Sequence, residues 1–367
     1  MTILFILEYY YPHTGGVETF FKKLVDSLDQ EGHKIIIVTN QYEATLPALE
    51  YIGNVEIRRY RFYNRYLFTF GAWLVAWEAA KSADLIHTTS YNAALPSWIV
   101  AKLARKKSII TFHEVWGDLW DELPWMSTFS KRLHKGIEEL ITKLHFDRFV
   151  GVSDFTKNAL IKAGVSSEKV RRIYNGIEYP VQAKYNDNSK NDVFQFLFFG
   201  RVSYSKGVDL LIEAMRLLKE SKAIFQLKMI IPSEQTPLLT NALKLIKEYD
   251  LQDVIELQHD LPFASLQQAI AQADAVVIPS YSEGFCFAAV ETMAIGTPII
   301  SSGKGALKEV ISGKHIELAS FDAPTLYEAM VNAIKGKWNS KPLRTFPLSD
   351  TIEEYLKLYK ELLRSDT

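Results

Sequence analysis

Residues 273–301, ADAVVIPSYSEGFCFAAVETMAIGTPIIS, combine a strand, a loop, a helix and a second strand in one short segment. The unbroken apolar run at 275–278 is typical of a buried parallel strand. A polar loop follows it, the helix is expected at 285–295, and the second strand is expected around 298–300. This β-α-β order predicts an α/β fold whose strands are parallel and whose helices cover the sheet.

Two glutamates, Glu283 and Glu291, follow the first of these strands. In open α/β sheets, ligands bind in the crevice beyond the carboxyl ends of the strands. Gly284 precedes a helix N-terminus, where free backbone N–H groups and a partial positive charge suit a diphosphate. An ionised carboxylate only accepts hydrogen bonds, so the two glutamates suit sugar hydroxyls. The segment therefore predicts a site for a phosphorylated ligand rich in hydroxyl groups.

The composition narrows the class of protein. A chain of 367 residues exceeds what one hydrophobic core usually organises, so two domains are expected. A formal net charge of -1 argues against a nucleic-acid-coating protein. Cys286 is the only cysteine, which excludes an intrachain disulfide and a cysteine-based zinc site. No signal-peptide pattern or membrane-length apolar run is present, so we expect a cytoplasmic protein, with contact at a membrane surface left open.

A polar segment without periodicity, YPVQAKYNDNSKNDV at 179–193, is the best linker in the chain. Strand and helix patterns alternate before it, and the same alternation restarts after it. The sequence therefore predicts an N-terminal Rossmann-like domain at 1–178 and a C-terminal one at 194–349. A last helix is expected within 350–367.

Other residues with useful chemistry also follow predicted strands. Gly15 and Gly16 lie between a strand and a helix, where they permit close approach of a phosphate or sugar, or simply form a tight turn. His113 ends a strand and is placed either to face a ligand or to be satisfied by local backbone. Arg201 and Lys206 follow the first strand after the linker. They are either two solvated cations or, as we favour, a pair that complements a diphosphate.

Two segments have a composition that suits an anionic surface. Residues 58–77 mix four arginines with many aromatic side chains, and residues 131–146 form an amphipathic helical pattern flanked by basic groups. Both could contact anionic lipid, and the first could contact a polyanionic acceptor. Packing of one helix face on the sheet is the simpler interpretation of each.

Taken in order, these motifs resemble the retaining glycosyltransferases of family 4. Glu283 and Glu291 match the E-x7-E signature of that family, and PSYSEGF around Glu283 matches its surroundings. Further matches in the expected order are Gly15-Gly16-Val17-Glu18, Thr111-Phe112-His113-Glu114, Val152-Ser153, Asn175-Gly176-Ile177-Glu178 and Gly200-Arg201…Lys206-Gly207. The resemblance covers nearly the whole chain.

The resemblance implies a GT-B fold, in which two Rossmann-like doubly wound parallel-sheet domains face each other across a cleft. Domain 1–178 would bind the acceptor, domain 194–349 the nucleotide-sugar donor, and the helix within 350–367 would cross back to the N-terminal domain. The implied reaction moves a sugar, with retention, from a UDP- or GDP-linked donor to a hydroxyl of a glycan or lipid-linked acceptor. Cell-surface polysaccharide, lipopolysaccharide or glycolipid synthesis is the expected setting, and neither a metal nor another cofactor is expected.

Residue roles follow from the resemblance position by position. Arg201 and Lys206 would hold the donor diphosphate and stabilise the leaving group. Glu283 would contact the transferred sugar, Glu291 the ribose hydroxyls, and His113 the donor sugar near the acceptor.

The remaining donor contacts are expected from backbone. Gly15 and Gly16 would pass under the diphosphate, and the phosphate cradle would be completed by Gly284, Phe285, Cys286 and Phe287. Cys286 departs from the family pattern, which usually has a small residue there, often glycine. No acceptor-binding residues are predicted. A non-catalytic nucleotide-sugar-binding module and a sugar-nucleotide epimerase are the alternatives.

Overall fold

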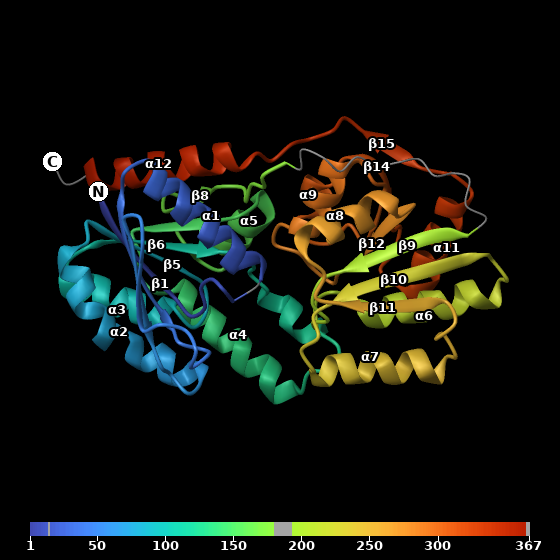
Figure 1. Ribbon diagram of the computed structural model, residues 1–367, viewed down its shortest axis with the longest axis horizontal. Coiled ribbons are helices and arrows are strands. Elements are labelled where there is room, and N and C mark those ends of the chain that lie inside the picture. Colours follow the sequence, from blue (N-terminus) through green and yellow to red (C-terminus); the bar gives the residue numbers. More distant parts are fainter. Residues whose placement is uncertain (14, 180–192, 365–367) are drawn as a thin grey trace. The chain divides into compact units, whose positions relative to one another are not determined.

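The computed structural model describes residues 1–13, 15–179 and 193–364, which form two compact units (Figure 1). The first unit takes the described residues of Met1–Trp120, Phe129–Gly176 and Leu348–Thr367, and the second takes those of Asp121–Thr128 and Ile177–Pro347. Except for its two end residues, the linker predicted at 179–193 lies outside the described residues. The predicted domain limits stay predictions.

The described part of the first unit is built on an eight-stranded sheet in the order β3-β4-β2-β1-β5-β6-β7-β8. Neighbouring strands are parallel except β3 and β4, which pair antiparallel. The strands are β1 (Thr2–Leu7), β2 (Lys34–Asn40), β3 (Leu49–Ile52), β4 (Val55–Tyr60), β5 (Leu85–Thr89), β6 (Lys107–Phe112), β7 (Arg148–Gly151) and β8 (Val170–Arg172).

Helices cover both faces of this sheet because side chains alternate along each strand. Leu4 and Ile6 of β1 pack in one cluster with α2 and α3, whereas Phe5 points the other way and packs edge-on against Phe21 of α1. The last helix, α12, contacts α1 on that second face (Figure 1). The helices are α1 (Gly16–Gln30), α2 (Arg65–Ser82), α3 (Ala94–Ala104), η1 (Gly117–Glu122), α4 (Thr128–Thr142), α5 (Asp154–Lys162) and α12 (Leu348–Arg364).

A buried polar network fastens α12 to the sheet of the first unit. His87 on β5 lies 2.7 Å (Nδ1) from the Tyr359 hydroxyl and 2.8 Å (Nε2) from the Thr111 hydroxyl. Thr111 in turn lies 3.0 Å from the Tyr355 hydroxyl. Burial lowers the pKa of His87 to about 3, so its imidazole is neutral at pH 7. The network satisfies polar groups that would otherwise be buried without partners.

The described part of the second unit holds a seven-stranded sheet in the order β11-β10-β9-β12-β13-β14-β15. Only the β14–β15 pair is antiparallel within that sheet. The strands are β9 (Phe194–Phe199), β10 (Phe225–Ile231), β11 (Ile255–His259), β12 (Ala275–Ile278), β13 (Ile299–Ser301), β14 (Gly313–Glu317) and β15 (Asn339–Lys341). The helices are α6 (Val208–Glu220), α7 (Pro237–Glu248), α8 (Phe263–Gln272), α9 (Phe287–Ile295), α10 (Leu307–Val310) and α11 (Ala323–Ile334).

The predicted α/β class with doubly wound, mostly parallel sheets is confirmed, with one correction at the edges. Each sheet ends on one side in a short antiparallel strand, β3 or β15, which the purely parallel prediction did not contain. A short hairpin adds β3 to β4, whereas the chain passes through α11 before β15 pairs with β14. A second correction concerns α9, which begins at Phe287 rather than at 285.

Candidate functional site

Two loops of the second unit bring most of the predicted donor-site residues to one edge of its sheet. Arg201 and Lys206 lie in the loop after β9, and Glu283 lies in the loop after β12. Strands β9 and β12 are parallel neighbours, so their carboxyl ends are adjacent. The prediction that these residues follow strands at this edge agrees with the structure, whereas their roles are not tested by it.

An ion pair joins the two loops. The ammonium of Lys206 lies 2.7 Å from Oε1 of Glu283, although the two residues are 77 positions apart. Ser280 donates a second hydrogen bond of 2.7 Å to the same oxygen. Glu283 is only 4% exposed, while the Lys206 side chain remains partly exposed. A carboxylate this buried needs hydrogen-bonding or charged partners, and Ser280 and Lys206 supply them. Because Lys206 is partly exposed, a ligand can also reach its ammonium.

Two glycines let the surrounding backbone close around this pair. Gly207 has φ 64°, and a Cβ at this position would lie 1.9 Å from the carbonyl oxygen of Pro279. Gly305 also has φ 64°, and its Cβ would lie 2.4 Å from the carbonyl oxygen of Glu283. Only glycine fits either position without displacing backbone. Sequence reasoning missed Gly305, because its requirement arises from a contact between distant loops.

The N-terminus of α9 adjoins the same loop. Its N-cap residue is Cys286, which has φ 78° and provides no side-chain cap for the first N–H groups of the helix. This left-handed conformation favours glycine, which gives a physical reason for the glycine usual in the family. Cys286 is buried, and burial raises the pKa of its thiol above the ordinary range. The thiol therefore stays protonated and unreactive at neutral pH.

The neighbouring predicted residues occupy the loop and the helix around this N-terminus. Phe285 packs edge-on against Phe287 and Phe346, at ring-centroid distances of 5.6 and 5.3 Å. Gly284 is buried, and Glu291 is half-buried in α9. All four predicted residues therefore lie in the loop or the helix that follows Glu283 in the sequence.

Arg201 stands apart from that pair. Its side chain is exposed in the loop after β9, and it makes no salt bridge with another described residue. The structure therefore places Arg201 at the correct sheet edge without drawing it into the ion pair. A cation in that position keeps its full charge for a ligand.

His113 lies at the tip of β6 in the first unit. Its Nδ1 is 3.5 Å from the side-chain nitrogen of Asn175, and Phe20 and Phe21 pack edge-on against its ring. Its Nε2 is buried and has no hydrogen-bond partner among the described residues. Burial lowers the pKa of His113 to about 4, so the imidazole is neutral at pH 7. Asn175 was not predicted as a site residue, although it belongs to a motif that the resemblance rests on.

Gly15 and Gly16 lead into α1 in the same unit. Gly15 is the N-cap residue in extended backbone, and the carboxylate of Glu18 folds back over it, where a Cβ on Gly15 would meet Oε2 at 2.2 Å. His13 lies 3.4 Å from Glu18. The missing side chain of Gly15 therefore leaves room for the Glu18 carboxylate beside the N-terminus of α1. Sequence reasoning did not single out Glu18.

Metal-binding clusters and membrane spans are both missing from the part of the chain that the structure describes. The described residues contain no group of three or more histidine, cysteine or acidic side chains arranged to hold a metal ion. None of the helices described combines the length and apolar character needed to cross a membrane.

Comparison with known families accounts for both units. The model described as Glycosyltransferase Family 4 matches residues 14–179, and the model described as Glycosyl transferases group 1 matches residues 182–342. The chain belongs to the family 4 glycosyltransferases. The resemblance drawn from the motifs is confirmed, and this glycosyltransferase is an enzyme that uses nucleotide sugars.

Relatives match this glycosyltransferase over most of its length. An uncharacterized glycosyltransferase of Methanocaldococcus jannaschii is 26% identical over 330 residues, which cover 81% of this chain and 79% of the relative. A phosphatidylinositol N-acetylglucosaminyltransferase component of Arabidopsis thaliana is 20% identical over 344 residues, which cover 91% of this chain and 74% of the relative.

Solved structures show that the fold of this glycosyltransferase is GT-B. Sucrose-phosphate synthase from Thermosynechococcus elongatus superimposes with a TM-score of 0.82 at 20% identity and covers 100% of both chains. Anabaena HepE, solved in complex with UDP and glucose, gives a TM-score of 0.74 at 16% identity and covers 98% of this chain and 99% of its own.

Proposed function

We propose that this glycosyltransferase moves a sugar, with retention, from a UDP- or GDP-linked donor to a hydroxyl of a glycan or lipid-linked acceptor. In this proposal the second unit binds the donor and the first unit binds the acceptor, in the synthesis of a cell-surface polysaccharide, lipopolysaccharide or glycolipid. Two likenesses support it: HepE was solved with UDP-glucose, and the Arabidopsis relative is named for a transfer to phosphatidylinositol.

One observation carries the donor half of the proposal: the Lys206–Glu283 pair beside the N-terminus of α9. Lys206, Arg201 and the helix N-terminus would together stabilise the negative charge that builds on the departing diphosphate. Glu283, held by Ser280 and Lys206, would accept hydrogen bonds from hydroxyls of the transferred sugar.

The bond changes follow from retention without a carboxylate nucleophile. The bond between the anomeric carbon and the phosphate oxygen breaks, and the acceptor oxygen forms the new bond on the same face. The acceptor proton passes to the departing phosphate. The proposal gives Glu283 and Glu291 separate contacts with the sugar and the ribose, rather than the roles of acid and nucleophile that flank the bond in a hydrolase.

The other site residues complete the proposed donor cradle. Glu291 would accept from the ribose hydroxyls, and the backbone around Gly15 and Gly16 would pass under the diphosphate. Neutral His113, whose Nε2 has no described partner, would hydrogen-bond the donor sugar.

Substitution of the two cations tests the donor assignment. We expect Arg201→Ala and Lys206→Ala each to lower kcat by about a hundredfold or more, because each removes charge that stabilises the leaving group. Arg201→Ala is the cleaner probe, since Arg201 is exposed and its loss leaves no buried partner. Lys244→Ala, which removes an exposed cation on α7, is the matched control. Near-wild-type transfer by either variant, with folding intact, would contradict the proposal.

The two alternatives are separated by binding and turnover. A non-catalytic module would show thermal stabilisation by UDP, GDP or ADP without sugar release or transfer. An epimerase would convert the donor sugar without an acceptor. The transferase proposal expects nucleotide binding together with acceptor-dependent loss of the donor.

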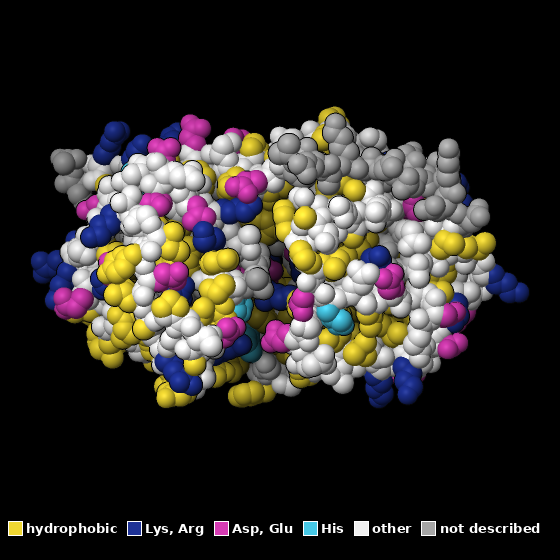
Figure 2. Space-filling model, viewed as in Figure 1, with side chains coloured by type: hydrophobic (Ala, Val, Ile, Leu, Met, Phe, Trp, Pro, Cys, Tyr) yellow, Lys and Arg dark blue, Asp and Glu magenta, His cyan; other side chains and the backbone are white. Residues whose placement is uncertain are grey.

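We also propose that the first unit contacts an anionic membrane surface peripherally. Helix α4 exposes an apolar stripe with helical spacing, formed by Phe129, Leu133, Ile137 and Leu140. Helix α2 exposes a second apolar group, Tyr66, Leu67, Phe70 and Leu74. Figure 2 shows hydrophobic side chains at the surface on the side of the first unit where Figure 1 places α2 and α4.

Charge around the α4 stripe favours anionic lipid as the occupant. Lys131 and Arg132 lie next to the stripe in the same helix. We expect sedimentation with vesicles of phosphatidylserine and phosphatidylcholine, little with phosphatidylcholine alone, and a loss of binding in the variant Phe129→Ser/Leu140→Ser. Ile224→Ser, an exposed apolar position in the second unit, is the control. Equal sedimentation of all three proteins would contradict this contact.

A further inference from the structure

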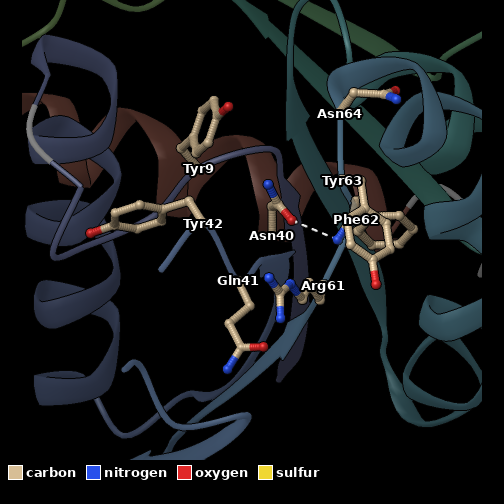
Figure 3. Close-up of a pocket in the computed structure, with 8 residues that line it drawn as sticks. All are labelled: Tyr9, Asn40, Gln41, Tyr42, Arg61, Phe62, Tyr63 and Asn64. Carbon is tan, nitrogen blue, oxygen red and sulfur yellow. Dashed lines mark hydrogen bonds between the residues drawn. The ribbon is translucent and has the colours of Figure 1, made fainter. Parts of the chain in front are cut away.

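A hollow lies in the first unit, and its lining contains none of the residues assigned to the donor site. It has a volume of about 260 Å³ and lies beyond the carboxyl ends of β1, β2 and β4, which are neighbours in the sheet. Its lining residues are Tyr9, Asn40, Gln41, Tyr42, Arg61, Phe62, Tyr63 and Asn64 (Figure 3). In parallel α/β sheets this edge is the one that binds ligands.

The lining combines aromatic rings with amides and one cation. In Figure 3, Asn40, Gln41 and Arg61 occupy the middle of the hollow, with Tyr9 and Tyr42 to one side and Tyr63 to the other. Aromatic rings pack against the C–H faces of a sugar ring, while amides and a guanidinium bond its oxygens. No acidic side chain is among the lining residues.

The polar groups of this hollow are already fixed by the fold. Asn40 Oδ1 accepts from the backbone N–H of Phe62 at 2.9 Å, which ties the end of β2 to the loop after β4. Gln41 donates to the carbonyl of Leu46 at 2.6 Å, and Asn64 caps α2 by accepting from Leu67 N–H. Asn40 therefore keeps its amide N–H₂ for a ligand, and Gln41 keeps its carbonyl. Such preorganisation is typical of a binding site.

Arg61 differs from the arginines just before it in the sequence. Arg58 pairs with Glu56 at 2.7 Å, and Arg59 pairs with Glu50 at 2.7 Å. Arg61 instead lies over the ring of Tyr63, 5.4 Å from its centroid, and has no salt bridge to any described carboxylate. The structure thus neutralises two of these cations and leaves the third with its charge directed at the hollow.

We propose that this hollow binds the acceptor through a negatively charged sugar, a hydroxylated ring that carries a carboxylate or a phosphate. The inference rests on the proposed function, and it adds the chemical class of the acceptor. Arg61 pairs with the anionic group, the amides of Asn40 and Gln41 bond ring hydroxyls, and Tyr9 or Tyr42 packs on the ring.

The hollow also adjoins the glycine loop of the same unit. Tyr9 stacks on His13 with ring centroids 4.5 Å apart, and Tyr42 packs edge-on against both. His13 in turn contacts Glu18, which folds over Gly15. An aromatic path therefore connects the hollow to the loop that the proposed function assigns to the donor.

Matched ligands test the charge requirement directly. Binding of methyl β-glucuronide and of glucose 6-phosphate to the full chain is measured by ligand-observed NMR, each against its neutral counterpart, methyl β-glucoside or glucose. One charge-assisted hydrogen-bonded pair predicts about tenfold or more tighter binding of the charged sugar. The uronate and phosphate arms show which anion the hollow prefers. Equal binding of charged and neutral sugars, or no binding of either anion, overturns the proposal.

Variants locate the effect at the hollow. Arg61→Gln is expected to bring charged and neutral sugars to nearly equal affinity, while Arg58→Gln, which alters a paired arginine of the same stretch, keeps the difference. Unchanged discrimination in Arg61→Gln overturns the assignment.

UDP and GDP binding, measured on the same samples, separates the two proposals. If the protein binds neither UDP nor GDP but still prefers charged sugars, the donor assignment is wrong and the anionic-sugar site is supported. If the protein binds a nucleotide but binds charged and neutral sugars equally, the anionic-sugar site is wrong and the donor assignment is supported.

Discussion

Glu283 shows how a single carboxylate is placed by groups that are remote in sequence. Lys206 and Ser280 bond its side chain, and Ala306 N–H donates to its carbonyl at 2.8 Å. Spacing identified Glu283 and Lys206 as residues that follow strands, because strand patterns are local. Their contact was not predictable from spacing, because it depends on β9 and β12 being neighbours in the sheet.

Substitution of Gly305 tests this backbone packing. Gly305→Ala is expected to destabilise the protein by several kcal/mol, because its Cβ would meet the Glu283 backbone. Gly336→Ala is the matched control: Gly336 also has positive φ, but nothing lies within 4 Å of its Cβ position. It should lose only about 1–2 kcal/mol. Urea unfolding of both variants measures the difference, and equal losses would show that the close contact is absent.

Cys286 gives a second prediction at this scale. The buried thiol, whose pKa burial raises, should react with a thiol reagent such as DTNB far more slowly in the native protein than in urea. The rate is measured at pH 8 by absorbance. Because the chain has one cysteine, the unfolded sample is its own control. Fast reaction of the folded protein would mean that the loop before α9 opens.

At the scale of elements, the packing of α12 on the sheet depends on the neutral imidazole of His87. The helical pattern near the end of the chain predicted this helix, but nothing in the sequence signalled that Tyr355 and Tyr359 meet His87 on β5. Buried polar partners are specified by tertiary packing, so a single sequence does not reveal them.

This network predicts that stability falls as the pH falls below the ordinary pKa of histidine. Burial lowers the pKa of His87 to about 3, so between that value and about 6.5 the unfolded chain takes up a proton that the folded chain excludes. For His87 alone the loss between pH 7 and pH 5 is about 2 kcal/mol.

The variant His87→Gln isolates that loss. It should be less stable than the parent at pH 7, yet lose about 2 kcal/mol less on going to pH 5. His145→Gln, at an exposed position, is the control. Chemical denaturation at the two pH values gives the comparison, and an unchanged pH dependence in His87→Gln would contradict the neutral network.

For the whole molecule, the sequence predicted the α/β class, the family and the enzyme class. It missed the antiparallel edge strands β3 and β15, because such short segments lack a clear periodic signal. The sequence also predicted no acceptor-binding residues. Tyr9 and Arg61 lie in the loops after β1 and β4, and Asn40 ends β2, so only the strand order brings them into one hollow.

The proposed chemistry predicts that transfer does not need a divalent cation. Lys206, Arg201 and the N-terminus of α9 would supply the charge that a metal supplies in other transferases. Dialysis against EDTA followed by assay in EDTA should therefore leave most of the transfer rate. Recovery of a lost rate by Mg²⁺ or Mn²⁺ would contradict this prediction. A metal-dependent transferase run under the same conditions shows that chelation was complete.

The return of α12 to the first unit has a consequence for biosynthesis. The partners of His87 and Thr111 are Tyr355 and Tyr359, which a ribosome adds more than 240 residues later. Until then the part of the sheet face that α12 covers is exposed, and His87 and Thr111 lack their tyrosine partners. We therefore expect stalled or prematurely terminated chains that lack α12 to engage chaperones or be degraded, even when every residue up to Gly176 has been made.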